Sequence, residues 1–219
     1  MGLVQLSLLK RDIRKRLLRN RDNNHFIPYE WLVDLVKEDR IHNVLYETDI
    51  EVRDRISIVS TVSIVRVNAL RVFGILVLIE KPQLIFNFVG HDITDGRLPI
   101  GKEAVLEVLG EPSLTKRRED LVKNQELKAT NDNDEVRNLE AQIAPIQEWA
   151  EDFVEMQWIF LSPDFLQPSP HRKILDGRPL PFLANSGNRG GHFGDVFEEK
   201  LPSPAFNDDA QKVIIPQVR

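Results

Sequence analysis

The first 21 residues combine apolar and basic positions with the period of an α-helix. The apolar residues recur at steps of three and four, which places them along one face, and basic residues fill most other positions. The pattern predicts an amphipathic helix over residues 3–21. Its apolar stripe packs on the protein's own core, contacts an anionic membrane surface or docks in a partner groove. The stripe comprises Leu3, Leu6, Leu9, Ile13 and Leu17, and the basic residues are Lys10, Arg11, Arg14, Lys15, Arg16, Arg19 and Arg21.

Two further apolar blocks predict buried helices. Residues 29–37 place apolar side chains on one helical face, and residues 56–79 form the longest apolar region, interrupted by Arg66 and Arg71. Because two arginines near a bilayer centre cost several kcal/mol, we expect a buried helix or helix pair in the middle of a bundle, and no transmembrane segment. Residues 72–79 taken alone also fit a buried strand.

A polar stretch separates these blocks from a second periodic region. Residues 112–134 are charged and polar, so we expect an insertion or an exposed loop there. Residues 135–160 return to helical spacing, and Pro145 is expected to kink or restart that helix. The aromatic residues of this region are predicted to lie in the core; they include Trp149, Phe153 and Trp158.

The domain organisation follows from these patterns. We expect a mainly α protein with a bundle-like helical domain over residues 1–165. Residues 166–183 are rich in proline and predict an extended linker. Residues 184–219 form a separate C-terminal segment rich in glycine at its start.

Composition excludes several kinds of chemistry. The chain has no cysteine, which removes disulfides and thiol nucleophiles and fits a reducing, cytoplasmic environment. Its five histidines are far apart, and none is paired at metal-ligand spacing. A net charge of -5 indicates no general affinity for nucleic acid. We also find no hydrolase or P-loop motif, and so predict no catalytic residue, metal or cofactor.

The C-terminal segment contains part of the sequence motif of a protein-kinase glycine-rich loop. In the pattern G-x-G-x-x-G-x-V, Gly191, Gly194 and Val196 take fixed places, and Gly190 could serve only in a slipped loop. Arg189 stands where the first glycine belongs. The best match to the strand that should carry the phosphate-pairing lysine is residues 213–216, which end in proline instead. We therefore interpret Gly190, Gly191, Gly194 and Val196 as a vestigial ATP loop.

Several short motifs occur in order along residues 25–200: Phe26-Ile27-Pro28, the apolar block 72–79, Asp95-Gly96-Arg97-Leu98-Pro99, the block 155–165, and Leu180-Pro181-Phe182-Leu183 before the glycines. This series resembles the N-terminal regions of uncharacterised serine/threonine protein-kinase-like proteins of filamentous fungi. The resemblance implies a cytoplasmic protein in which a helical region precedes a kinase domain. It also implies that residues 184–219 are an incomplete kinase N-lobe β-hairpin, truncated before the catalytic machinery.

Two functions remain open at this point. The chain is a non-catalytic N-terminal regulatory or interaction region of a protein-kinase-like protein, which binds a protein partner or its own kinase lobe. Alternatively, it is a standalone helical scaffold or adaptor with the basic N-terminal helix as its binding surface. We expect no enzymatic activity from this chain, and a serine/threonine kinase only if a longer product exists.

Overall fold

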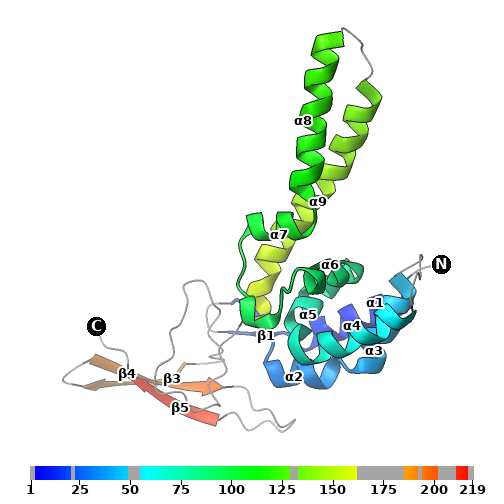
Figure 1. Cartoon of the computed structure of the whole chain (residues 1–219). Helices are drawn as coiled ribbons and strands as arrows, with labels where there is room; N and C mark the ends of the chain where they lie inside the picture. The colour runs from blue at the N-terminus through cyan, green and yellow to red at the C-terminus, as the bar shows by residue number, and fades with distance from the viewer. Residues whose placement is uncertain are drawn as a thin grey trace.

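The computed structural model describes residues 3–20, 23–48, 55–128, 133–161, 185–191, 194–201 and 211–216. Most of these residues are helical, which confirms the predicted mainly α fold (Figure 1). The helices are α1 (Val4–Lys15), α2 (Tyr29–Leu35), α3 (Glu38–Thr48), α4 (Arg55–Asn68), α5 (Leu70–Leu78), α6 (Ile85–Gly90), α7 (Lys102–Val108), α8 (Glu111–Lys128) and α9 (Asn133–Phe160), with short 3-10 turns η1 (Pro82–Leu84) and η2 (Asp95–Arg97).

The strands fall into two small antiparallel groups. β1 (Leu18–Arg19) and β2 (His25–Phe26) form a short hairpin after α1. Near the C-terminus, β3 (Asn185–Gly191), β4 (Gly194–Leu201) and β5 (Gln211–Pro216) form a three-stranded sheet in the order β3-β4-β5. The expected linker at residues 166–183 lies outside the described residues.

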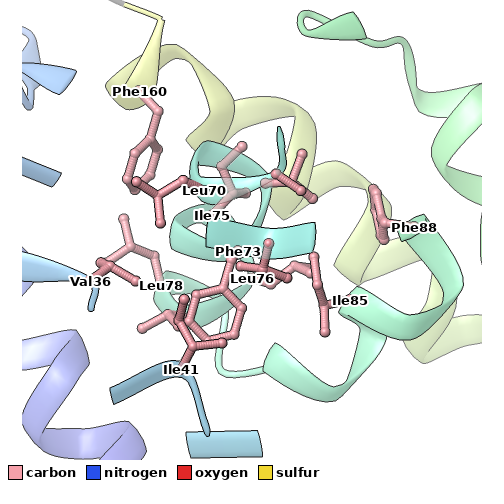
Figure 2. Packing of buried hydrophobic residues seen from close by; sticks show 14 of the residues in the cluster. Val36, Ile41, Leu70, Phe73, Ile75, Leu76, Leu78, Ile85, Phe88 and Phe160 are labelled. Carbon is pink, nitrogen blue, oxygen red and sulfur yellow. The ribbon is translucent and has the colours of Figure 1, made fainter. Parts of the chain in front are cut away.

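Helix α5 lies at the centre of the helical domain. Eight of its nine residues are apolar or glycine and are buried, and Arg71 is the exception. It contacts α1, α2, α4, α6 and α9, so neighbouring helices surround it. Figure 2 shows Phe73 and Leu76 of α5 close to Ile85 at the start of α6. The helical interpretation of residues 72–79 is therefore confirmed, and the alternative of a buried strand is wrong.

The apolar region before α5 is a second helix, and the two are bent by 106° at Ala69. Among the residues that the structure describes, no single helix has the length and hydropathy to cross a membrane. Only this bent pair, taken together, has both. The prediction that residues 56–79 are buried in the middle of a bundle is wrong for α4. Of the two helices, only α5 is enclosed by other helices, because α4 leaves one face exposed, including Val59 and Val67.

The apolar stripe of α1 packs on the protein's own core. Leu6, Leu9 and Ile13 are buried in the same cluster as α5, whereas Leu3 is exposed. The stripe is therefore not available to a bilayer or to a partner groove. Of the three alternatives for residues 3–21, packing on the core is confirmed for the apolar stripe, and contact of that stripe with a membrane surface is wrong, because the core buries the same side chains.

Of the two alternatives for residues 112–134, an insertion or an exposed loop, the loop is wrong over most of its length. Residues 111–128 form the 18-residue helix α8, and the last two residues of the stretch begin α9. Helix α8 is polar, but Glu, Lys, Arg, Leu and Gln dominate it, and these are strong helix formers. Packing against α9 provides the tertiary support that a polar helix lacks by itself.

Helix α9 runs without interruption through Pro145, so the predicted restart does not occur. Its core residues are partly those expected: Phe153 is buried, whereas Trp149 and Trp158 are only partly buried. Gln157, for which no sequence pattern predicts burial, is also buried. Its side chain accepts a hydrogen bond from the Ile100 N–H (3.0 Å) and donates to the Ile100 carbonyl (3.1 Å). It thus ties the loop before α7 to α9 with its polar atoms satisfied.

Two helices receive their N-terminal caps from distant segments. Neither α1 nor α5 has a capping side chain at its own N-cap residue. Glu47 of α3 accepts hydrogen bonds from the first backbone N–H groups of α1, at 2.7 Å from Val4. Asp95 of η2 accepts bonds from the N–H groups of Arg71 (2.9 Å) and Val72 (3.1 Å) in α5. Both carboxylates satisfy otherwise unpaired helix donors and favour the positive end of the helix dipole.

Gly74 permits the contact between α5 and the end of α9. A Cβ added at Gly74 would lie 2.6 Å from Cε1 of Phe160, which is a buried ring. We therefore expect Gly74→Ala to destabilise the protein by about 1–2 kcal/mol, because overpacking outweighs the roughly 1 kcal/mol gain in helix propensity. The free energy of unfolding measured in urea tests this. Gly90→Ala is the control, since an added Cβ there meets no atom within 4 Å. Equal or greater stability of Gly74→Ala would contradict the packing described.

Asp95 predicts a specific pH dependence. Burial raises its pKa, although the hydrogen bonds from the backbone N–H groups of α5 act in the opposite direction. The folded protein therefore binds this proton more tightly than the unfolded chain does. The stability that this group contributes is fully present below its unfolded pKa of about 3.9, and is lost as the pH rises through the folded pKa.

Comparison with Asp95→Asn isolates this effect, because Asn keeps an acceptor oxygen but does not titrate. We expect the stability of the wild type relative to Asp95→Asn to fall as the pH rises above about 4, as measured by urea unfolding at each pH. Asp92→Asn, at an exposed carboxylate in the preceding turn, should show no comparable trend. A relative stability that stays constant or rises with pH would show that burial does not dominate at Asp95.

Candidate interaction site on the α8–α9 arm

Helices α8 and α9 form a hairpin that projects from the rest of the helical domain (Figure 1). We call α8 together with residues 133–147 of α9 the arm. Along α9, buried residues alternate at steps of three and four over its whole length, which is the 3.5-residue repeat of a coiled-coil seam. They are Val136, Leu139, Ile143, Ile146, Ala150, Phe153, Gln157 and Phe160.

The same seam serves two parts of the molecule. The second half of α9 contributes Ala150, Phe153 and Phe160 to the main hydrophobic core, where Phe153 stacks on Phe88 with ring centroids 4.8 Å apart. The first half lies outside that core cluster and packs against α8. One continuous helix therefore fixes the arm to the core.

Helix α8 covers this seam with a face that is partly polar. Its half-buried residues follow the same three-and-four spacing and are divided between polar and apolar types; they are Glu111, Leu114, Thr115, Arg118, Leu121 and Val122. Ion pairs hold the two helices at their edges: Arg118 Nη2 lies 2.6 Å from Glu140 Oε1, and Arg117 Nη2 lies 2.7 Å from Glu135 Oε1. Such exposed pairs contribute about 0–1 kcal/mol each. The arm is thus held by a thinner apolar seam than the core.

A groove of about 370 Å³ follows one side of the seam between α8 and α9. Its lining combines the small residues Thr115 and Ala144 and the buried Ile143 with charged and amide side chains. The complete lining is Glu111, Thr115, Arg118, Glu140, Ile143, Ala144 and Gln147. A groove between two neighbouring helices is a surface that suits another helix.

Sequence reasoning missed this groove because residues 112–134 were expected to be a loop. The strict repeat along α9 was the available signal. A seam that continues well before the core begins requires a second helix to cover it, and the only nearby candidate in sequence is the polar stretch.

Ion pairs engage part of the charged surface of α1. Arg40 of α3 donates a hydrogen bond to Asp12 (2.7 Å), the acidic residue of α1, and lowers the pKa of that carboxyl group. Lys10 donates to Glu80 at the end of α5 and likewise lowers the pKa of Glu80. Exposed basic side chains remain on this helix, including Arg11, Arg14 and Lys15. The predicted binding surface therefore survives only as a charged face, without an apolar anchor.

The predicted ATP-loop residues lie together at one end of the C-terminal hairpin. Gly191 is opposite Gly194, Gly190 is opposite Asp195, and Val196 is opposite Arg189. On its other side Val196 is opposite Pro216 of β5. The two residues between Gly191 and Gly194 lie outside the described residues. The backbone thus forms an antiparallel hairpin at this point, with a proline in the neighbouring strand.

The part of the chain that the structure describes contains no group of three or more histidine, aspartate or glutamate residues that could hold a metal ion. No family model, no curated protein and no solved structure matches the chain.

Proposed function

We propose that the chain is a non-catalytic regulatory or interaction region of a cytoplasmic protein-kinase-like protein, and that the arm is its working surface. The observation that carries this proposal is the arm itself: a helical hairpin outside the main core, attached to it by a continuous helix and hollowed along one side by a groove. Combined apolar and polar side chains are typical of surfaces that bind protein helices. The polar groups of this groove include the ion-paired Arg118 and Glu140, an arrangement suited to orienting a bound chain.

The C-terminal sheet supports the kinase-like part of the proposal. Glycines cluster where β3 and β4 meet, and a third antiparallel strand follows them. A kinase N-lobe begins with the same order of a glycine-rich turn and a following strand that carries lysine. Here Pro216 occupies the end of that strand, and proline offers neither an ammonium group nor an N–H. The hairpin is in this proposal a relic that does not bind nucleotide.

A standalone scaffold that uses the basic face of α1 is the second candidate. The exposed Arg11, Arg14 and Lys15 favour it, since such a face attracts acidic partners. The arm is the better candidate because its groove combines apolar and small side chains with paired charges, whereas α1 offers charge alone.

Titration of the full chain with Mg-ATP tests the non-catalytic assignment. We expect no saturable heat of binding in isothermal titration calorimetry at dissociation constants below about 1 mM, equivalent to roughly -4 kcal/mol. The reason is that Arg189 replaces the first loop glycine and Pro216 replaces the phosphate-pairing lysine. Gly194→Val serves as the control, since a side chain at this place blocks a working loop. Saturable binding that Gly194→Val abolishes would overturn the proposed function.

A further inference from the structure

The charged residues of the arm groove are arranged symmetrically about its centre. On α8, Glu111 and Arg118 are seven residues apart and lie on either side of Thr115. On α9, Glu140 and Gln147 are also seven residues apart and lie on either side of Ala144. A spacing of seven residues is two helical turns, about 10 Å, so each pair lies on one face of its helix.

Both pairs are centred at the same level of the arm. Arg118 of α8 contacts Glu140 of α9, with Nε–Oε1 and Nη2–Oε1 distances of 2.9 and 2.6 Å. Because the helices are antiparallel, the other two members, Glu111 and Gln147, then lie together at the opposite end of the groove. The small residues Thr115 and Ala144 lie between the two ends.

We propose that the groove is occupied by the same groove of a second copy of this chain, so that two arms form an antiparallel four-helix bundle. This inference rests on the proposed function and names its partner. A two-fold axis across the centre of the groove stacks α8 on α8 and α9 on α9 in opposite directions. That operation brings Glu111 of one copy opposite Arg118 of the other, and Glu140 of one copy opposite Gln147 of the other.

Charge complementarity distinguishes this occupant from an unrelated helix. A two-fold interface places each surface against itself, so most charged surfaces meet like charge. In this groove every charged residue instead meets an opposite charge or an amide. Arg118 lies between its own Glu140 and Glu111 of the second copy, while Thr115 and Ala144 allow close approach of the helices around Ile143. The second copy also supplies apolar contacts to the half-polar seam that α8 leaves.

Light scattering on the full chain after size-exclusion chromatography measures the oligomeric state directly. We expect twice the chain mass of 25.3 kDa at about 100 µM, with dissociation on dilution. Ala144→Glu should weaken the dimer at least tenfold, because it puts a charged side chain in the groove. Ala141→Glu is the matched control: it is also an exposed alanine of α9 but does not line the groove, and it should leave the dimer intact.

A charge reversal gives a second readout that does not depend on Ala144. Glu111→Arg places arginine opposite Arg118 of the second copy and should also weaken the dimer at least tenfold. Circular dichroism checks that both variants remain folded. A monomer at about 100 µM, or equal effects of the substitutions at positions 144 and 141, would overturn the second copy as the occupant. A chain that is monomeric, binds no Mg-ATP and takes up another protein's helix would overturn this inference alone. Saturable Mg-ATP binding would instead overturn the proposed function, whatever the oligomeric state.

Discussion

The burial of α5 is the constraint on which the rest of the helical domain depends. A nine-residue helix is too short to be stable alone, and burying it removes water from the unpaired backbone groups at both ends. At the N-terminal end, Asp95 replaces that water by accepting bonds from two backbone N–H groups. At the C-terminal end, the N–H of Lys81 bonds the Leu76 carbonyl (2.8 Å) and the N–H of Glu80 bonds the Val77 carbonyl (3.2 Å), which is a Schellman motif.

The C-terminal end of α5 also shows how local strain is compensated. Glu80 has a φ of 61°, in the left-handed region where glycine is usual at this position of the motif. Its side chain pairs with Lys10 of α1, so the residue that ends the central helix also holds the N-terminal helix against it. Glycine at position 80 would relieve the backbone and lose this tie. Two carboxylates from different segments thus keep α5 in place, one at each end.

The sequence predicted those parts of the fold in which buried and exposed residues alternate with the period of the helix. The stripe of α1 and the apolar circumference of α5 are readable because core packing repeats with the helical period. The caps by Glu47 and Asp95 were not predictable, since a carboxylate 23 or more residues away from the N–H groups that it caps leaves no local signal. The groove of the arm was not predicted for another reason. Hydrophobicity alone indicated a loop, although the residues of α8 are good helix formers.

The repeat along α9 explains both the prediction and its error. Ala150 and Gln157 are two positions of the seam, and one is small and the other polar. The sequence pattern therefore favours the larger neighbouring residues Trp149 and Met156 as core positions instead. Those larger residues lie beside the seam and are only partly buried. Gln157 is tolerated in the core because its amide has partners in the backbone of Ile100, and no sequence pattern reveals that pairing.

The C-terminal hairpin shows why a backbone arrangement does not by itself indicate nucleotide binding. Glycines near a tight turn suit a two-stranded hairpin of any function, because they accept the backbone angles of the turn without steric cost. Nucleotide binding additionally requires a lysine at a set place on the following strand. In β5 Pro216 stands at that place, opposite Val196, and Lys212 lies toward the other end of the strand, opposite Lys200. Helical surfaces are the better basis for function here. On the arm, apolar, small and oppositely charged side chains line one groove, and the proposed binding uses only these side chains.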